Sequence, residues 1–360
     1  MKIAVITCYF DPDYVRARTL RAALANIPGV KTVIVKNRHK GLLRYPEMLR
    51  KIYRLRGREK PDVYLLTFRG QEILPFVLWV AGKKPVWFDE FIVPIAYATN
   101  EKHHASFAIH VKHFLARVSV PLYKGWMRRC SVILADTRAH AELSAKAAHM
   151  NLSKYVAVPV GADEDLFTPG PHEPAGDTFQ VFYYSSGMQP LHGIPVVLDA
   201  AVRLAEEKNI EFVIAGGKKP MKQAVEAAQA AGARIRYERW IPFDALIRTI
   251  RSSGLCLGGP FGNTTQAQHV ITGKTYQFLA AAAPTLIGRS EASQEFFVDK
   301  ENALVVNQGS SDDLVRGIRW AYKHPEELRV ISENGRKLYE KQFSTAAIAS
   351  LLKPLVDAAS

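Results

Sequence analysis

The chain has 360 residues, and its 48% hydrophobic and 23% charged residues are typical of globular proteins, which excludes collagen, coiled coils and wholesale disorder. Lysine and arginine outnumber aspartate and glutamate by 48 to 34, so the formal net charge is +14, which predicts attraction to nucleic acid, anionic lipid or phosphorylated substrates. Three widely spaced cysteines without a Cys-x-x-Cys pair argue against a disulfide framework and predict a reducing, cytoplasmic compartment.

The N-terminal apolar run is predicted to be a first β-strand rather than a secretory signal, because Asp11-Pro12-Asp13 ends it without a cleavage site. The longest apolar stretch, Ile73–Ala81, has about half of the roughly 20 residues that a membrane-spanning helix needs. These two observations predict a soluble cytoplasmic protein, with peripheral contact to the inner face of a membrane still open.

In the first half of the chain, short β-branched and aromatic runs alternate with longer helical patterns. The predicted strands are Lys2–Thr7, Thr32–Val35, Val63–Phe68, Val86–Phe88, Val132–Ala135 and Tyr155–Val158. The predicted helices are Tyr14–Ala25, Tyr45–Leu55, Gln71–Val80, His104–Arg128 and Arg138–Ala148. Several strands are apolar at consecutive positions, as expected for strands covered on both faces, so the pattern predicts a doubly wound parallel sheet.

A linker is predicted at 169–178, where five of ten residues are proline or glycine. The alternation then resumes. Its predicted strands are Gln180–Tyr184, Glu211–Ala215, Arg234–Tyr237, Leu255–Leu257 and Thr285–Ile287, and its predicted helices are Gly193–Glu207, Met221–Ala231, Phe243–Ser252 and Lys274–Ala282. The sequence therefore predicts two doubly wound α/β domains, residues 1–168 and 169–344, facing a cleft and binding ligands at the carboxyl ends of their strands.

The basic charge is concentrated in residues 31–60, which hold eleven lysines and arginines against Glu47 and Glu59, a net charge of +9. Basic and apolar residues alternate there at helical spacing, which predicts a basic amphipathic helix. Two interpretations stay open, an anionic membrane surface as partner and a solvated helix packed on the sheet. Nucleic acid is not expected as a partner, because no recognition motif accompanies the charge.

A strand, a glycine turn and a helix start follow one another at the beginning of the second domain. Gly187 allows a ligand to approach the backbone, and free N–H groups near Gly193 favour an anion such as a diphosphate. His192 is placed to add a hydrogen bond or a positive charge, and Met188 lies in the same turn.

A second loop, 258–265, is predicted to meet the same crevice because it also follows a strand. Its glycines, amides and hydroxyls suit a loop that wraps a ligand, and it contains Phe261, Gly262, Asn263 and Thr264. At the start of the next helix, Lys274 can pair with a phosphate. Gln277, one turn later, can hydrogen-bond a ribose hydroxyl.

At this point the sequence resembles a family. The motifs that carry the resemblance are Val158-Pro-Val-Gly-Ala-Asp163 with Phe167-Thr-Pro169, Gly187 with Leu191-His-Gly193, Phe261-Gly262, Lys274 with Gln277-Phe-Leu-Ala280 and Pro284, Glu301-Asn-Ala-Leu-Val305, and Phe343-Ser344. In their order and spacing they resemble glycosyltransferase family 4, the retaining nucleotide-sugar glycosyltransferases of the GT-B fold. The resemblance implies that the second domain binds the donor, with the nucleotide base beside Trp240. It also implies that a C-terminal helix, 345–360, crosses back to the first domain.

The sequence departs from the family in the donor site. Met188 and His192 stand where the family usually has an arginine and a lysine, and Gln277 replaces one of two glutamates. The other glutamate is absent near Gly259. These departures predict a variant donor site.

The first domain is predicted to supply the catalytic and acceptor-binding groups. Asp89 is the first candidate for a catalytic carboxylate and Glu90 the second, because both directly follow an apolar strand; the alternative is a carboxylate that caps the next segment. Another loop facing the crevice begins at Asp136-Thr137. The residues predicted to contact the acceptor are Tyr14, Arg16, Arg69 and Glu72, with surface ion pairing as the alternative.

No metal site is predicted, because the histidines at 103, 104, 110 and 113 lack a completing carboxylate or cysteine set. No cofactor is expected beyond a nucleoside diphosphate sugar as co-substrate. The resemblance implies transfer of a sugar from that donor to an acceptor hydroxyl, and the +9 segment favours a lipid-linked or cell-envelope glycan. The alternatives are a catalytically silent GT-B-like regulatory partner and, less favoured, a nucleic-acid-binding protein.

Overall fold

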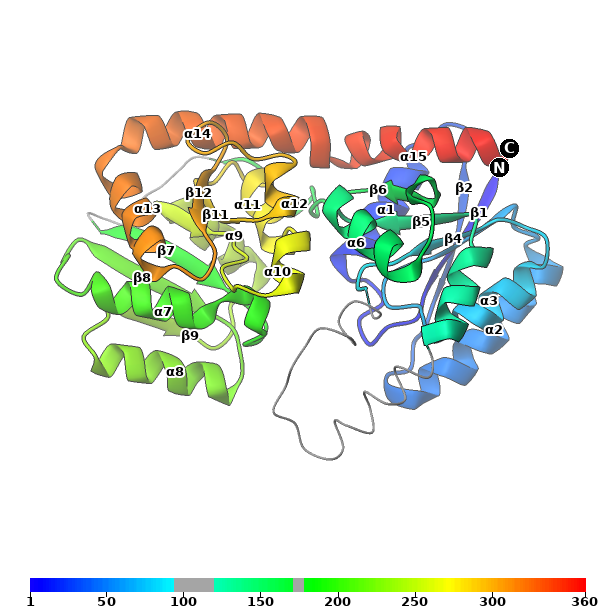
Figure 1. Ribbon diagram of the computed structural model, residues 1–360, viewed down its shortest axis with the longest axis horizontal. Helices are drawn as coiled ribbons and strands as arrows, with labels where there is room; N and C mark the ends of the chain where they lie inside the picture. The colour runs from blue at the N-terminus through cyan, green and yellow to red at the C-terminus, as the bar shows by residue number, and fades with distance from the viewer. Residues whose placement is uncertain (94–119, 171–177) are drawn as a thin grey trace. The chain divides into compact units, whose positions relative to one another are not determined.

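The computed structural model describes residues 1–93, 120–170 and 178–360, and these form two compact units (Figure 1). Unit 1 comprises Met1–Val160 and Thr345–Ser360, and unit 2 comprises Gly161–Ser344. The division falls at Val160, whereas the sequence analysis placed the domain boundary after residue 168. Most of the predicted linker, the four histidines considered as metal ligands and most of the predicted helix His104–Arg128 lie outside the described residues; residues 120–129 are helical.

Unit 1 is built on a six-stranded parallel sheet of order β2-β1-β3-β4-β5-β6. Its strands are β1 (Lys2–Thr7), β2 (Lys31–Lys36), β3 (Val63–Leu66), β4 (Val86–Asp89), β5 (Val132–Ala135) and β6 (Tyr155–Ala157). Its described helices include α1 (Val15–Ala25), α2 (Arg44–Arg58), α3 (Leu74–Ala81), α6 (Arg138–Ala148) and α15 (Thr345–Ala359).

The consecutive apolar residues of β1 show why the strands of unit 1 are hydrophobic throughout. Ile3 and Val5 pack with buried residues of α1 and α15 on one face of the sheet. Ala4 and Ile6 pack with buried residues of α2, α3 and α6 on the other face. Because successive side chains of a strand point to opposite faces, both sets must be apolar when both faces are covered.

Unit 2 has a six-stranded parallel sheet of order β12-β11-β10-β7-β8-β9. Its strands are β7 (Phe179–Tyr184), β8 (Ile210–Ala215), β9 (Ile235–Glu238), β10 (Leu255–Leu257), β11 (Thr285–Arg289) and β12 (Leu304–Asn307). Its helices include α7 (Ile194–Arg203), α8 (Lys219–Ala230), α9 (Phe243–Ser252), α10 (Thr265–His269), α11 (Gly273–Ala280), α12 (Glu291–Gln294), α13 (Ser311–Lys323) and α14 (Pro325–Leu338). The sequence analysis named no element corresponding to α10, β12 or α12–α14.

The strand order of each sheet reverses once. In unit 1 the reversal lies between β1 and β3, because β1 is followed along the chain by β2 on one side and by β3 on the other. In unit 2 it lies between β7 and β10 for the same reason. Loops leave the carboxyl ends of the two strands in opposite directions at such a point, and the crevice between them is where doubly wound sheets bind ligands.

Among the described residues, no helix combines the length and the apolar character that crossing a lipid bilayer requires.

Candidate functional site

Two loops meet at the switch point of unit 2. One follows β7 and ends in a short 3-10 helix, Pro190–His192, and the other follows β10 and includes Phe261-Gly262. The Gly262 N–H donates a hydrogen bond to the Leu191 carbonyl at 3.0 Å. A Cβ on Gly262 would lie 1.9 Å from the Pro190 carbonyl oxygen, so no larger residue fits there. Sequence analysis predicted that these two loops converge, and the structure places them in contact.

Gly193 is required at the start of α7 for two reasons. Its φ of +65° lies in the left-handed region, which a residue with a Cβ rarely adopts. A Cβ at this position would also lie 2.4 Å from the backbone carbon of Phe261. The N-terminus of α7 therefore packs against the backbone of the second loop at Phe261.

A buried cation lies at the same edge of the sheet. The Lys274 side chain, in the first turn of α11, is only 6% exposed. Its Nζ lies 4.1 Å from the centre of the Tyr183 ring and donates a hydrogen bond to the Tyr184 carbonyl at 3.3 Å. No carboxylate pairs with Lys274 among the described residues. Burial lowers the pKa of Lys274 to about 7, so the amine is close to its titration point at neutral pH.

His192 adds a second nitrogen base beside Lys274. Burial and the Lys274 charge together lower the pKa of His192 to about 3. Within the described part of the chain, its Nδ1 is buried and has no hydrogen-bond partner. Burial lowers the pKa values of both basic side chains, and no negative charge among the described residues stabilises their protonated forms. An anion bound here would stabilise both protonated forms and raise both pKa values.

Gln277 lies one turn after Lys274 on α11 and is partly exposed. The Tyr184 hydroxyl donates a hydrogen bond to its side-chain oxygen. The side chain is thus fixed at the carboxyl end of β7, on the same edge as the glycine turn.

The remaining predicted donor residues differ in exposure. Gly187 borders open space, and Met188, Asn263 and Trp240 are exposed, Trp240 by 71%. Phe261 is buried in the core of unit 2, and the Thr264 hydroxyl caps α10 by accepting the Ala267 N–H. Phe261 and Thr264 therefore support the loop from within, and we assign them no contact with a ligand.

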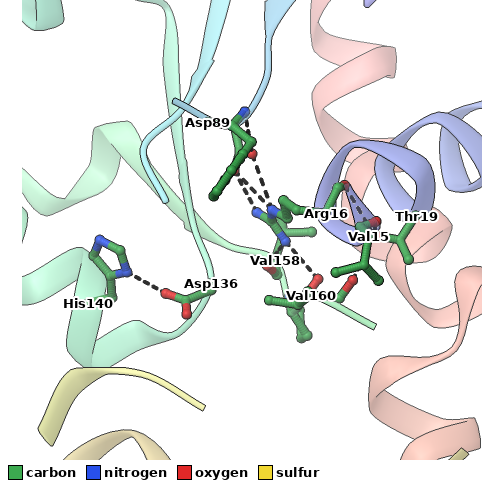
Figure 2. Close-up of polar contacts among 10 residues, drawn as sticks. Val15, Arg16, Thr19, Asp89, Asp136, His140, Val158 and Val160 are labelled. Carbon is green, nitrogen blue, oxygen red and sulfur yellow. Dashed lines mark hydrogen bonds and ion pairs between the residues drawn. The ribbon is translucent and has the colours of Figure 1, made fainter. Parts of the chain in front are cut away.

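In unit 1, Asp89 forms a fully buried ion pair with Arg16 of α1 (Figure 2). The Arg16 Nη2 and Nε donate to Asp89 Oδ1 at 2.8 and 3.0 Å, and the Phe68 N–H donates to Oδ2 at 3.2 Å. Arg16 also donates to the carbonyls of Val158 and Pro159, so it fastens the segment after β6 to α1. The side chain of Arg16, which was predicted to contact the acceptor, is fully enclosed. The contacts give Asp89 a structural role in an ion pair, whereas the structural alternative stated for it was capping of the next segment.

Glu90 is also buried, but among the described residues no basic group pairs with it directly. It accepts hydrogen bonds from the Tyr123 hydroxyl at 2.9 Å and from the Ser144 hydroxyl. Burial raises the pKa of Glu90 to about 7, although both hydrogen bonds and the His140 charge oppose the rise.

Asp136, in a loop expected from the sequence to face the crevice, forms a buried pair with His140, for which no role was expected from the sequence. Asp136 follows β5, and His140 lies four residues later in the first turn of α6, where its Nδ1 hydrogen-bonds Asp136 Oδ1 (Figure 2). Burial lowers the pKa of His140, but the charge and hydrogen bond of Asp136 outweigh it and leave the pKa raised. The spacing Asp-x-x-x-His after an apolar strand is the signal that was available in the sequence.

An aromatic cluster occupies the switch point of unit 1. Tyr14 stacks on Phe68 with ring centres 4.5 Å apart, and Tyr9 and Phe91 contact the same Phe68 ring edge to face. Arg69 lies over the Tyr9 ring at 5.7 Å. Of the predicted acceptor residues, Tyr14 and Arg69 therefore lie in this cluster, and Glu72 is exposed before α3.

Among the described residues, no group of three or more histidine, cysteine, aspartate or glutamate side chains is arranged to hold a metal ion.

Residues 197–353, less than half of the chain, match the family model described as glycosyl transferase-like. No curated protein matches the chain. Among solved structures, HepE of Anabaena in complex with UDP-glucose is 12% identical with a TM-score of 0.73 over 99% of this chain and 100% of that chain. Sucrose-phosphate synthase of Thermosynechococcus elongatus is 15% identical with a TM-score of 0.75 over 100% of both chains. A glycosyltransferase of Rickettsia africae is 10% identical with a TM-score of 0.69 over 99% and 98%. The α/β fold class is confirmed: the chain has two six-stranded parallel sheets and the GT-B fold of these neighbours.

Proposed function

We propose that the chain is a glycosyltransferase that moves a sugar from a nucleoside diphosphate sugar to an acceptor hydroxyl, with the donor bound by unit 2. The observation that carries the proposal is the buried, unpaired cation Lys274 beside His192 at the switch point of unit 2. Two facing glycine loops and the N-terminus of α7 lie at the same place. Together they offer backbone N–H groups and two bases to one anion, which suits a diphosphate.

The same arrangement suits the chemistry of transfer. As the bond between the anomeric carbon and the diphosphate oxygen breaks, its electron pair stays on the diphosphate, and negative charge grows there. Protonated Lys274 and His192 and the N–H groups before α7 stabilise that charge most strongly when it is greatest. We therefore propose metal-independent transfer, with Gln277 binding a ribose hydroxyl.

We further propose family 4 membership and retention of the anomeric configuration, which rest on the order of motifs in the sequence. The match of residues 197–353 to a glycosyl transferase-like model supports the activity. HepE of similar fold has been crystallised with UDP-glucose, which makes UDP and UDP-glucose the first ligands to test.

For the acceptor we propose a lipid-linked or cell-envelope glycan, reached from the cytoplasmic face of a membrane. Leu42 and Leu43 are 82% and 66% exposed just before the basic helix α2. On α2 and α3, Tyr53 and Trp79 stack with ring centres 6.1 Å apart, and both rings are 57% exposed. Leu42, Leu43 and Tyr53 lie within the segment of net charge +9, and Trp79 lies against Tyr53. Exposed apolar and aromatic side chains beside such a positive charge suit an anionic lipid surface.

Donor binding is tested by isothermal titration calorimetry of the full chain with UDP, UDP-glucose and GDP at pH 8. Lys274 is mostly neutral at that pH, so binding of the diphosphate draws a proton onto it, and the measured enthalpy depends on the ionisation enthalpy of the buffer. We expect K274M to lose both the affinity and the proton uptake. The matched control is K222M on α8, where Lys222 is exposed and paired with Glu226. Unchanged binding by K274M contradicts the proposed donor site, and binding without turnover in any acceptor screen favours the catalytically silent alternative.

Membrane binding is tested by sedimentation with vesicles of phosphatidylcholine containing 30% phosphatidylglycerol. The double variant Y53A/W79A should bind more weakly than the parent chain, because it loses the exposed aromatic pair and keeps the charge. The control is W240A, which removes an equally large exposed indole from unit 2. Equal binding by the parent and Y53A/W79A contradicts the proposed membrane surface.

A further inference from the structure

Two buried polar atoms at the carboxyl end of β5 have no hydrogen-bond partner among the described residues. They are Oδ2 of Asp136 and Nε2 of His140, on side chains that are each only 1% exposed. Buried polar atoms are almost always hydrogen-bonded, because leaving one unsatisfied is costly. Two such atoms on one hydrogen-bonded pair of side chains indicate a binding site in which a ligand supplies the missing hydrogen bonds.

The pair is not needed to begin α6. The Thr137 side chain already caps this helix by accepting the His140 N–H at 3.0 Å. In Figure 2 the Nδ1 edge of the His140 ring faces Asp136, and the second ring nitrogen points away from it. With the Nδ1 proton donated to Asp136, Nε2 accepts a hydrogen bond in the neutral ring and donates one in the protonated ring, the form that Asp136 favours.

The surroundings of the pair are both polar and aromatic. The acidic groups that act on His140 are Asp136, Glu90 and Asp89, and Asp89 is neutralised by Arg16. Asp136 also acts on the Tyr14 hydroxyl, which places the phenol within electrostatic range of the pair. Tyr14 in turn stacks on Phe68 in the aromatic cluster at the switch point of unit 1.

A ligand that carries hydroxyl groups on an apolar ring matches a site with polar atoms beside aromatic side chains. Two neighbouring hydroxyls of a sugar can hydrogen-bond to Asp136 Oδ2 and His140 Nε2, and the C–H face of the sugar can lie on an aromatic ring. We propose that Asp136 and His140 form the hydroxyl-binding end of a sugar subsite in unit 1. This inference rests on the proposed function, in which it identifies the acceptor as a glycan and names the residues that hold it.

The test uses the full chain labelled with 15N-histidine and four probes, the methyl glycosides of glucose, galactose, mannose and N-acetylglucosamine, each at 50 mM. We expect at least one glycoside to shift the Nε2 resonance of His140, which is assigned by its loss in H140N. His149, exposed at the end of the same helix, serves as the reference and should not shift.

The variants separate binding from folding. H140N keeps an amide near the Nδ1 position for Asp136 and removes Nε2, so it should fold and bind that glycoside about tenfold more weakly, as expected for one lost hydrogen bond. H149N should bind it as the parent does. If H140N does not fold, D136N takes its place, with the same expected loss of affinity and with the His140 resonance still visible.

The outcomes distinguish this inference from the donor proposal. If UDP binds and none of the four glycosides shifts His140, the sugar subsite is overturned and the donor site stands. If a glycoside shifts His140 and UDP does not bind, the donor proposal fails and the subsite stands. Unchanged affinity in a folded H140N overturns the subsite.

Discussion

Neutralising Asp89 should destabilise unit 1 strongly. In D89N the Arg16 guanidinium stays buried and charged, while the group that faces it is now a neutral amide. Removing one partner of a buried ion pair costs about 3–5 kcal/mol. Arg16 keeps its bonds to the Val158 and Pro159 carbonyls, so we expect the lower end, about 3 kcal/mol.

The assay must report on unit 1 alone, because a chain of two units does not unfold as one two-state system. Amide hydrogen exchange of peptides from β4 and α1 meets this need, with peptides of unit 2 as the internal reference. A loss of about 3 kcal/mol lowers the protection of the most protected unit 1 amides by about a hundredfold. The control is E142Q, which breaks the exposed pair of Arg138 and Glu142 and should cost at most about 0.5 kcal/mol.

The result also decides between the two roles considered for Asp89. A structural carboxylate predicts lost protection in unit 1 with UDP binding by unit 2 retained. If D89N is as well protected as E142Q but has lost sugar transfer, the structural assignment is refuted and Asp89 is a catalytic candidate again.

Three further predictions follow from buried groups and close contacts. The pKa of Glu90 is about 7 in the folded protein and 4.5 in its ordinary state, so between these pH values the folded state binds more protons than the unfolded state. The stability of unit 1 should therefore fall as the pH rises from about 4.5 to 7. E90Q should remove this dependence in hydrogen-exchange measurements across that range; an unchanged slope contradicts the assignment. The pKa of Lys274 is about 7 in the folded protein and 10.5 in its ordinary state, so between these pH values the unfolded state binds more protons. Without ligand, the stability of unit 2 should therefore rise from about pH 7 to 10.5. In thermal unfolding measured across this pH range, K274M should abolish the rise. G262A must displace the Pro190 carbonyl and should destabilise unit 2 by about 1–3 kcal/mol, whereas G187A, whose Cβ meets nothing within 4 Å, should unfold in denaturant like the parent.

The sequence predicts the parallel sheets well because their signal is local. Residues 3–6 are apolar at every position, and the structure shows helices on both faces of β1. The glycine turn before α7 is also local, since Gly187, His192 and Gly193 are close together in the chain. No helix or strand was predicted between residues 288 and 344, although α13 and α14 are helices of 13 and 14 residues.

The roles of the unit 1 carboxylates depend on long-range contacts that composition and spacing do not reveal. Arg16 and Asp89 are 73 positions apart, and only the folded sheet brings α1 to the end of β4. Glu90 and Ser144 are 54 positions apart in the same way. The spacing predicted that carboxylates gather at this edge, but it could not tell a paired carboxylate from an unpaired one.

The distribution of buried charge gives the strongest reason to place an anion in unit 2. Unit 1 buries Arg16 with Asp89 and His140 with Asp136, so each of these two basic groups has its own carboxylate. Lys274 in unit 2 has only an aromatic face and a carbonyl among the described residues. A merely structural amine of this kind could be replaced by an apolar residue with a gain in stability, because burying an unpaired charge is costly. Its presence is therefore best explained by a negatively charged ligand that completes the pair.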